Sequence, residues 1–545
     1  MGIYVNPGNR LFREAVNSPI YVDKSELIDY TNSVLDTQRK NICVSRPRRF
    51  GKSMVADMLA AYYSKGCDSG ELFAELNVSK EHKAVSAGEQ EIKRINAYKA
   101  NLNRHNVIRF DVQRFLFDES HVSVFIKRIQ DMVIRELETE FGICIDCAQD
   151  SYGLPGVLEQ IYAHTGEEFI FIIDEWDCVF RLAKENTEVQ KKYLDFLRGL
   201  FKGSEYVKLA YMTGIFPIKK YGEHSAINVF DEYSVTDPRN LNEYFGFTEK
   251  EVQEQCEKYD VDFTEMARWY DGYQIGDTHI YNPKSVVDAL TWKKFKSYWT
   301  GTETYEALKI YIERNFDGLR EAVLEMLGGG QCMIDPTIFQ NDMTTFYTKD
   351  DVLTMLVHLG YLTYDEKSSM VSIPNLEVEQ EFVRAVKVGG WGRLMETLNR
   401  SEELLKSTWA MDADAVAEGV ARARSDTASI IQYNDENSLA CALYVAYASA
   451  QAYYAKPIRE LPSGRGFADV VYLPKQNTDC PALVIELKWN KSAEGAIRQI
   501  KDKKYTDWVK SYTGDILLVA INYDKKKDIH ECIIEKYSFP RKSMS

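Results

Sequence analysis

The sequence predicts an α/β protein with a parallel sheet in its N-terminal part and a smaller α/β domain at its C-terminal end. Four short apolar runs have the length of buried strands, and stretches with helical periodicity separate them. They are residues 41–45, 106–111, 168–173 and 207–213. Such alternation favours parallel strands joined by helices. Two further apolar runs, 467–473 and 482–489, are separated by a polar loop and followed by a helical stretch.

The length of the chain, 545 residues, exceeds what a single hydrophobic core supports, so we expect several domains. We expect a phosphate-loop ATPase-type domain over residues 1–238 and a helical lid over 239–376. A helical connector over 377–430 and an α/β domain over 431–545 complete the chain.

The lid is expected to contain a winged-helix-like unit. Residues 349–359 have a helical pattern, and two short strand-like runs follow at 360–364 and 370–374. Such a unit binds DNA or merely packs against its neighbours. His358 lies among apolar residues of the helix, which indicates a core residue rather than a ligand.

The composition and charge of the chain indicate where the protein is located and which partners it binds. The net charge is −15, yet residues 456–545 hold 17 Lys and Arg against 12 Asp and Glu, so this end carries +5 and the remainder −20. A nucleic-acid contact is therefore expected in the last domain. The ten scattered cysteines indicate reduced thiols, and the N-terminus lacks a secretory pattern, so we expect a cytoplasmic protein that does not enter a membrane.

The first apolar run leads into a basic loop that ends in Gly51-Lys52-Ser53 and then a helix. This is the layout of a phosphate-binding loop, in which backbone N–H groups hold phosphates, the lysine reaches the β- and γ-phosphates, and the serine hydroxyl ligates Mg²⁺. Arg48 and Arg49 add positive charge for the phosphates. The full pattern has a glycine where this chain has Arg46, and a basic turn that caps an ordinary helix is the alternative.

Two acids follow the third apolar run. In phosphate-loop ATPases the first, here Asp174, orders the Mg²⁺ shell, and the second, here Glu175, polarises the attacking water. A strand that ends in a solvated acidic turn is the alternative. Thr213, at the end of the fourth run, is either a sensor of the γ-phosphate or a strand-terminal threonine.

The C-terminal pair of strands contains a second constellation of charged residues. Glu486 and Lys488 share one strand face, and Asp469 joins them if the two strands form a hairpin. Two carboxylates bind Mg²⁺ or Mn²⁺, and the ammonium orients or deprotonates water. An edge hairpin with an exposed Glu486–Lys488 salt bridge is the alternative.

Neighbouring helices offer further groups for this second site. Glu494, Arg498 and Gln499 lie on the helix that follows and are available to face it. Glu436 opens an earlier apolar helix and offers another carboxylate as a metal ligand.

Four motifs together resemble one bacterial family, the AAA-ATPase-like proteins with a C-terminal PD-(D/E)xK nuclease domain. They are Tyr21-Val-Asp-Lys-Ser25, Arg46-Pro-Arg-Arg-Phe-Gly-Lys-Ser53, Trp269-Tyr-Asp-Gly-Tyr273 and Ile485-Glu-Leu-Lys488. That family also lacks the first glycine of the phosphate loop, so the resemblance makes Arg46 a family trait.

The resemblance implies roles for individual residues. Lys52 and Ser53 serve nucleotide and magnesium, Asp174 and Glu175 form the second ATPase motif, and Asp469, Glu486 and Lys488 form the nuclease triad. Gln499 matches a helical glutamine of many such nucleases, although Lys503 stands where a tyrosine is expected. No arginine finger is assigned.

We therefore expect an ATP-binding, Mg²⁺-dependent protein that hydrolyses ATP and cleaves nucleic acid under nucleotide control, with DNA favoured over RNA and oligomerisation left open. The rival hypothesis is a non-cleaving nucleotide-dependent switch whose C-terminal domain binds a protein or nucleic acid. A third is an ATP-using enzyme whose two domains do not communicate.

Overall fold

The structure, a computed structural model, falls into two compact units. The first comprises Met1–Tyr298, Asp335–Ser369 and Pro374–Glu377, and the second comprises Trp299–Ile334, Met370–Ile373 and Val378–Ser545. The residues described are 2–80, 88–116, 124–142, 153–183, 186–218, 227–299, 318–339, 346, 348–388, 392–427, 436–455, 457–463, 466–475, 478, 480–502 and 514–537. The expected domain boundaries at 238, 376 and 430 stay predictions.

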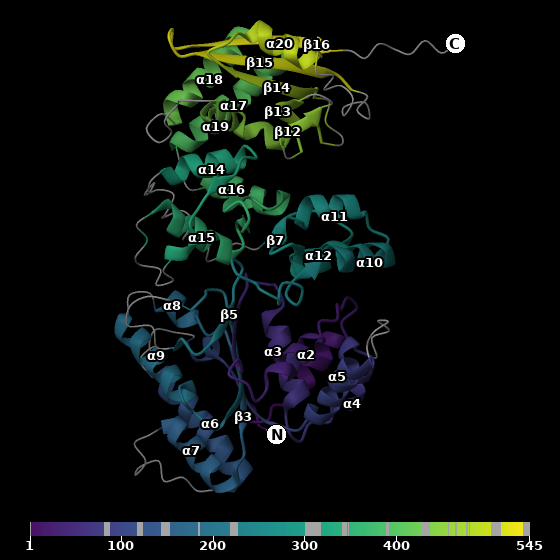
Figure 1. Cartoon of the computed structure of the whole chain (residues 1–545), viewed down its shortest axis with the longest axis vertical. Coiled ribbons are helices and arrows are strands. Elements are labelled where there is room, and N and C mark those ends of the chain that lie inside the picture. Colours follow the sequence, from purple (N-terminus) through teal and green to yellow (C-terminus); the bar gives the residue numbers. More distant parts are fainter. Residues whose placement is uncertain are drawn as a thin grey trace, which may run out of the picture. The chain divides into compact units, whose positions relative to one another are not determined.

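A five-stranded sheet in the order β2-β3-β4-β1-β5 forms the centre of the first unit (Figure 1), and its strand pairs are all parallel. The strands are β1 (Asn41–Ser45), β2 (Asn106–Asp111), β3 (Phe169–Asp174), β4 (Val207–Gly214) and β5 (Asp231–Tyr233). The parallel α/β sheet expected from the four apolar runs is confirmed. The short edge strand β5 was not among those runs.

Helices cover both faces of this sheet and enclose a separate apolar core on each (Figure 1). The first face carries α1 (Arg10–Val16), α2 (Leu27–Val34), α3 (Lys52–Tyr63), α4 (Gly70–Ala74), η1 (Asn77–Ser79) and α5 (Gly88–Asn101). The second carries η2 (Val112–Phe115), α6 (Phe125–Phe141), α7 (Gly153–Thr165), α8 (Cys178–Leu182) and α9 (Thr187–Phe201). Ile42 and Val44 face the first core and Cys43 the second, as strand alternation requires.

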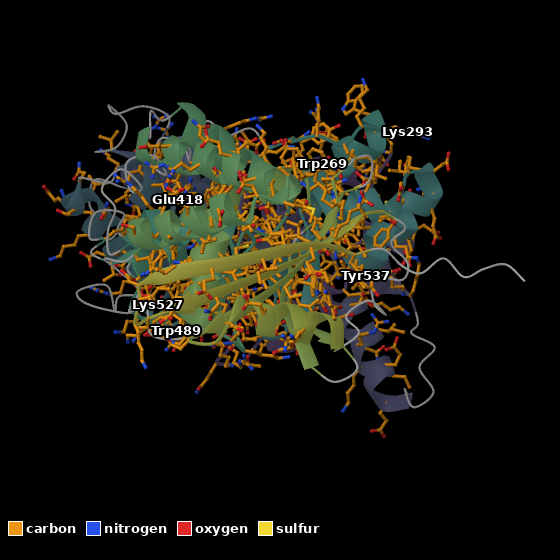
Figure 2. The ribbon with its side chains drawn as sticks, turned by 90° about the horizontal axis from the view of Figure 1, so that it is seen from above. Trp269, Lys293, Glu418, Trp489, Lys527 and Tyr537 are labelled. Carbon is orange, nitrogen blue, oxygen red and sulfur yellow. The ribbon has the colours of Figure 1, made fainter. Side chains whose placement is uncertain are left out.

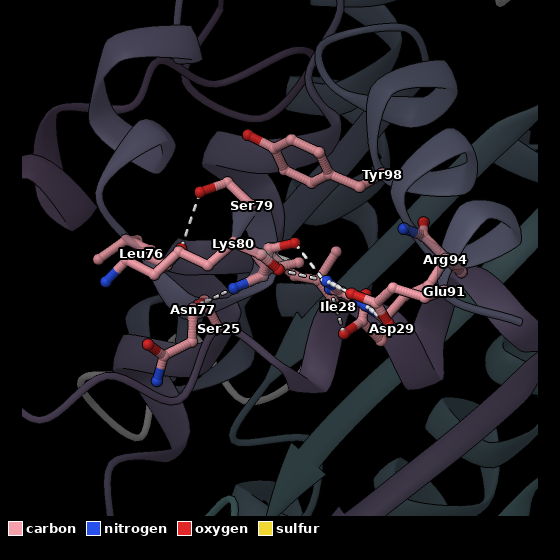
Figure 3. A network of polar contacts seen from close by, with 12 residues as sticks. Ser25, Ile28, Asp29, Leu76, Asn77, Ser79, Lys80, Glu91, Arg94 and Tyr98 are labelled. Carbon is pink, nitrogen blue, oxygen red and sulfur yellow. Dashed lines mark hydrogen bonds and ion pairs between the residues drawn. The ribbon is translucent and has the colours of Figure 1, made fainter. Parts of the chain in front are cut away.

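Helix α2 and Ser25 just before it are held by polar contacts to α5 and η1 (Figure 3). Arg94 on α5 donates from Nη1 to Asp29 Oδ2 (3.1 Å) and to the carbonyl of Val78 (2.9 Å). The hydroxyl of Ser25 accepts from Val78 N at 3.1 Å. Part of the motif Tyr21–Ser25 therefore connects this segment to η1.

The remaining elements of the first unit include a small antiparallel sheet in the order β6-β8-β7. They are β6 (Phe247–Thr248), α10 (Glu249–Tyr259), α11 (Phe263–Tyr270), β7 (Tyr273–Ile275), β8 (Thr278–Tyr281), α12 (Pro283–Trp292), η6 (Pro336–Ile338), α15 (Lys349–Leu359) and β10 (Thr363–Asp365). Lys24 ties this region to the N-terminal segment, because its ammonium contacts Glu251 Oε2 on α10 at 2.7 Å and the carbonyl of Glu243 at 2.6 Å.

His358 on α15 occupies the core position expected for it. Its side chain is buried, and its ring lies 5.4 Å from that of Phe339 and 6.4 Å from that of Phe216. Burial lowers the pKa of the imidazole to about 3, so the ring is neutral near pH 7.

The second unit is built on a sheet in the order β12-β13-β14-β15-β16, in which only the β14–β15 pair is parallel. Its strands are β12 (Ile458–Ser463), β13 (Gly466–Tyr472), β14 (Ala482–Trp489), β15 (Ile516–Asp524) and β16 (Ile529–Tyr537). The other elements are α14 (Leu319–Leu327), β9 (Cys332–Met333), β11 (Met370–Ser372), most of α16 (Leu376–Val388), α17 (Gly392–Trp409), α18 (Ala413–Thr427), α19 (Glu436–Ala446), η7 (Ala448–Ala452) and α20 (Ala493–Asp502).

The two faces of this second sheet have different covers. Helix α20 packs on the face that carries Ala482 and Val484 of β14. Helices α18 and α19 pack against β16 and β14, and α17 packs on both of these helices. The stretch 377–430, expected as a connector, thus supplies α17 and α18 to this unit.

In the described ranges, none of the helices combines the length and the apolar composition that a membrane crossing requires.

Candidate functional site

The phosphate-loop segment lies between β1 and α3. Gly51 has a left-handed backbone (φ +85°) and stands directly before Lys52, the first residue of the helix. A side chain is disfavoured at such φ, so the turn depends on glycine. The N-terminal N–H groups of α3 are thereby directed at the loop, as a phosphate site requires.

Lys52 is 4% exposed, and its ammonium donates to the carbonyl of Pro47 at 2.9 Å. Burial lowers the pKa of this ammonium, and the neighbouring Glu175 and Asp174 carboxylates oppose that effect. Of the two arginines before it, Arg48 is half-buried and Arg49 is exposed, with Nη1 3.3 Å from the carbonyl of Tyr298. Lys52 therefore lies inside the loop, and Arg49 lies at its outer surface.

Arg46, which replaces the first glycine of the usual pattern, is a buried structural residue. Its guanidinium donates to the carbonyls of Ser45 (2.9 Å), Tyr233 (2.8 Å) and Leu241 (3.1 Å) and lies over the ring of Phe245. Burial lowers its pKa to about 10, so the group stays charged near neutral pH. Arg46 thus joins β1 to β5 and to the following loop instead of contacting phosphate.

Asp174 and Glu175 are placed at the carboxyl edge of the sheet by β3. Ser53 on α3, which is exposed, lies near the Asp174 carboxylate. Burial raises the pKa of Asp174, and the nearby Ser53 hydroxyl opposes the rise. Ser53 and Asp174 were both predicted as site residues, and they lie 121 positions apart in the sequence. The parallel pairing of the sheet brings them together.

Glu175 has a left-handed backbone (φ +52°) and forms an ion pair with Arg181 on α8. Arg181 Nε also lies 3.4 Å from the fully buried Asp177, whose Oδ2 accepts from Phe216 N at 2.9 Å. Burial raises the pKa of Glu175, and Lys52 opposes the rise. The group predicted to activate water is thus held by a cation of its own chain.

Further charged residues line the same edge and were missed in the sequence. Asp111 pairs in register with Asp174 at the end of β2, and Asp57 on α3 forms an ion pair with Arg109 on β2. Asp111 ends a predicted strand, so the rule that located Asp174 would have found it. Asp57, Asp177 and Arg181 lie on helices or turns, and no sequence signal distinguishes them from surface charges.

Thr213 lies at the end of β4, opposite Val44 of β1. Its side chain is fully buried, and its hydroxyl has no hydrogen-bond partner among the described residues. A buried hydroxyl without a partner costs free energy, so this position is compatible with a ligand-facing role, and the two alternatives for Thr213 stay open.

The second constellation lies on the α20 face of the C-terminal sheet. Glu486 is 1% exposed, and its Oε1 accepts from Lys488 Nζ at 2.8 Å. Gln499 on α20 donates from Nε2 to the same oxygen. Glu494 and Arg498 on α20 are exposed, and neither contacts Glu486 in the described part of the chain.

The other two carboxylates predicted for this site are described only through their backbones. Strands β13 and β14 are antiparallel, with Val470 opposite Ile485. One further step in the same register places the backbone of Asp469 on β13 opposite that of Glu486 on β14. Glu436 is the first residue of α19. The side chains of both lie outside the described residues.

The donor sets at the two sites have the chemistry that Mg²⁺ prefers. Ser53 and Asp174 supply a hydroxyl and a carboxylate, and Glu486 with Asp469 supplies two carboxylates, all hard oxygen donors. Within the described ranges, no three His, Cys, Asp or Glu side chains are grouped as a ready-made metal cage. Mg²⁺ usually binds through one or two carboxylates and substrate phosphates, so the residues fit it.

Two family models match parts of the chain. Residues 11–222 match a family described as predicted AAA-ATPase, and residues 434–532 match the PD-(D/E)XK nuclease superfamily. The resemblance drawn from the motifs is thereby confirmed.

The chain is similar to a protein of Azotobacter chroococcum mcd 1 that is described as an uncharacterized protein in the vnfD 5′ region. The two sequences are 26% identical over 389 residues. The match spans 67% of this chain and 66% of the relative, slightly less than two thirds of the relative's length.

Two solved structures also match. The Aeropyrum pernix ORC2 protein (ADPNP-ADP complexes) is 9% identical, with 71% of this chain and 98% of that chain covered and a TM-score of 0.32. CDC6P from Pyrobaculum aerophilum is 12% identical, with 70% and 99% covered and a TM-score of 0.24. Scores this low support no conclusion about this chain.

Proposed function

We propose that this chain, which carries a predicted AAA-ATPase region and a region of the PD-(D/E)XK nuclease superfamily, hydrolyses ATP and cleaves nucleic-acid phosphodiesters under nucleotide control. The ATPase half rests above all on one observation. Ser53 at the start of α3 lies close enough to Asp174 at the end of β3 to lower the pKa of its carboxyl, and the buried ammonium of Lys52 lies beside them. A basic surface turn would not place these groups together.

Each residue of the ATPase site has a proposed role. Lys52 leaves the Pro47 carbonyl and binds the β- and γ-phosphates, while the N–H groups of α3 bind phosphate oxygens. Ser53 and Asp174 would hold Mg²⁺, which would supply positive charge to the phosphate oxygens. Thr213 senses the γ-phosphate, and the exposed Arg49 and half-buried Arg48 add positive charge at the entrance.

Glu175 is proposed to orient the attacking water. It contacts Arg181, and a carboxylate engaged by a guanidinium is a weaker acceptor for a water proton. Hydrolysis therefore requires that Glu175 turn from Arg181 toward the nucleotide.

The nuclease half rests on the contacts of Glu486. We assign Asp469 and Glu486, with Glu436 as a further carboxylate, to a Mg²⁺ or Mn²⁺ ion that would stabilise the charge of the pentavalent phosphate. Lys488 orients the attacking water, and Gln499 positions the Glu486 carboxylate. DNA is favoured over RNA as the substrate.

A non-cleaving switch is the second candidate, because one oxygen of the buried Glu486 accepts from both Lys488 and Gln499. A purely structural ion pair would have these contacts too. In that case the C-terminal domain binds a partner and ATP state controls the binding.

The test is an assay of the purified full chain with ATP and with single- and double-stranded DNA and RNA, in Mg²⁺ or Mn²⁺. Glu175→Gln is expected to keep ATP binding and to slow hydrolysis by about 10²–10⁴-fold. Lys488→Ala is expected to abolish cleavage, while Lys536→Ala, an exposed lysine in the same sheet, keeps it. Binding without metal-dependent cleavage by the wild type would favour the switch.

A further inference from the structure

The turn that joins β15 to β16 is an exposed basic projection close to the candidate nuclease site. Lys525, Lys526 and Lys527 are consecutive and exposed, and Lys491, just after β14, is exposed too. Figure 2 shows Lys527 and Trp489, the last residue of β14, at the same edge of the view. The turn therefore adds positive charge to one end of the C-terminal sheet.

The backbone of this turn is fixed to the strand that carries the site. Lys525 N donates to Asn490 Oδ1 at 2.8 Å, and Asn490 N donates to the carbonyl of Tyr523 at 2.8 Å. Asn490 lies two residues beyond Lys488 and directly after β14. The backbone of the turn is thus fixed at the end of the strand that carries the predicted catalytic residues.

A second tie lies on the α20 face itself. Asn522 pairs in register with Lys488, is fully buried, and accepts from Lys491 N at 3.1 Å through Oδ1. Its Nδ2 donates to the carbonyl of Lys491 and to Glu531 Oε2, both at 3.2 Å. Asn522 therefore holds the backbone of the chain just after β14 through two hydrogen bonds. This places Lys491 beside the face on which Glu486 and Lys488 lie.

The two acids of the turn contact groups of the same unit. Asp524 Oδ1 accepts from Lys526 N (2.9 Å) and Lys527 N (3.3 Å), and its Oδ2 lies 3.5 Å from the ammonium of Lys527. Asp528 accepts from the hydroxyl of Tyr523 at 2.6 Å and pairs with Arg424 of α18. These contacts shape the turn, and its three lysines are exposed.

We propose that the exposed lysines Lys491, Lys525, Lys526 and Lys527 form a surface that binds the phosphate backbone of the nucleic acid and directs it toward Glu486 and Lys488. The inference rests on the proposed nuclease function and names the contact surface of that site. The hydrogen bonds to Asn490 and Asp524 order the backbone of the turn before binding, which lowers the entropy cost of binding a polyanion. Contacts to phosphates position the substrate without selecting its sequence.

The test uses the full chain with Lys525→Gln and Lys526→Gln combined. Asp524 and Asn490 hold the turn through its backbone, so these substitutions remove charge without removing those contacts. The matched control combines Lys501→Gln and Lys536→Gln, exposed lysines that pair with Glu535 and Asp515 at the opposite end of the same sheet. Both variants lose the same charge.

Binding of a fluorescein-labelled DNA duplex is measured in EDTA by anisotropy, and its cleavage is measured in Mn²⁺. The turn variant is expected to bind at least about tenfold more weakly at about 50 mM salt, and its affinity is expected to fall about tenfold less between about 50 and 200 mM. The control variant is expected to match the wild type. Circular dichroism and thermal melting verify that both variants are folded.

Three outcomes would contradict the inference, each in a different way. If the turn variant binds and cleaves DNA as the wild type does, the lysines of the turn do not bind the substrate, while the proposed nuclease function stands. An equal loss in both variants also contradicts the surface, since net charge alone would then explain binding. If the wild type neither binds nor cleaves DNA or RNA, the proposed nuclease function fails and the surface fails with it.

Discussion

At the scale of residues, the first unit gathers opposite charges in a small buried volume. Lys52, Arg109 and Arg181 lie among the carboxylates of Asp57, Asp174 and Glu175, and several of these groups have pKa values displaced by burial. Removing charges from water is costly unless a partner or ligand compensates. Such displaced pKa values in one place are typical of functional sites.

Lys52→Ala is expected to weaken ATP binding by about 10–150-fold, because charge-assisted hydrogen bonds contribute about 1.5–3 kcal/mol. The Pro47 carbonyl loses its donor, yet the fold is expected to persist. Titration with a fluorescent ATP analogue gives the affinity. Lys65→Ala, at an exposed lysine that pairs with Glu167, is the control and should bind normally. Equal affinity in the Lys52 variant would remove Lys52 from the phosphate site.

Asp57 makes a pH-dependent contribution to stability. Burial raises the pKa of its carboxyl from 3.8 to about 6, with Arg109 opposing the rise. Between these two values the folded state binds more protons than the unfolded state, so this contribution falls as pH rises from about 4 to 6. The upper limit of the loss is about 3 kcal/mol.

The measurement compares thermal melting of the wild type and Asp57→Asn from about pH 4 to pH 7. The wild type is expected to lose stability relative to the variant as pH rises through this window, and the difference should stay constant above it. Parallel curves over the whole range would show that Asp57 titrates normally.

At the scale of elements, the ends of strands and the starts of helices determine where the chemistry lies. The carboxyl ends of β2, β3 and β4 meet at one edge of the sheet, and α3 begins at that edge beside β1. In the second unit, strand alternation places Glu486 and Lys488 on the face covered by α20, where Gln499 reaches Glu486. Each candidate site thus combines two or more elements.

Gly214→Ala tests the end of β4. A Cβ at this position would lie 2.5 Å from Asp177 Oδ1 and 2.7 Å from the ring of Trp176, both buried. We expect a loss of about 1–3 kcal/mol in stability and reduced ATP hydrolysis, since Asp177 and Arg181 must shift. Thermal melting and ATPase assays measure both effects.

Gly199→Ala in α9 is the matched control. Among the described residues, its Cβ would meet only Pro155 Cγ, at 3.9 Å, so the change is expected to stabilise the helix by roughly 0.5–1 kcal/mol. If the Gly214 variant is as stable as the Gly199 variant, the packing at the end of β4 is more adaptable than the distances indicate.

At the scale of the whole molecule, one chain joins a region that matches a predicted AAA-ATPase to a region of a nuclease superfamily. A nuclease that was always active would harm its own host. The region that matches a predicted AAA-ATPase is part of the same chain as the nuclease-like region. We therefore expect nucleotide state to control access to Asp469, Glu486 and Lys488.

The usual allosteric coupling of about 1–3 kcal/mol predicts a roughly 5- to 150-fold difference in cleavage between ATP-bound and nucleotide-free protein. Lys52→Ala is expected to erase this difference without changing the nuclease site. In the presence of ATP, Glu175→Gln is expected to stay in the ATP-bound state, because hydrolysis is slow. Its cleavage rate should therefore remain at the value that ATP-bound protein shows. Cleavage that is identical with and without ATP in the wild type and both variants would mean that the two regions act independently.

The sequence by itself determined the local features of the protein. Apolar runs of strand length located β1 to β4, β13 and β14, because burial on both faces of a strand requires a continuous apolar run. The Gly-Lys-Ser step after β1, the acids after β3 and the shared face of Glu486 and Lys488 follow from spacing along one or two elements.

Only the tertiary structure decided which distant residues meet. It buried Arg46 against the carbonyls of two distant segments, at Tyr233 and Leu241, and placed Ser53 beside Asp174. It also added Asp57, Asp111, Asp177 and Arg181 to the same edge. It also brought Gln499 rather than Arg498 to Glu486. The physical reason is that periodicity reports how a residue is buried, whereas its partner depends on strand order and helix packing, which involve residues far apart in the sequence.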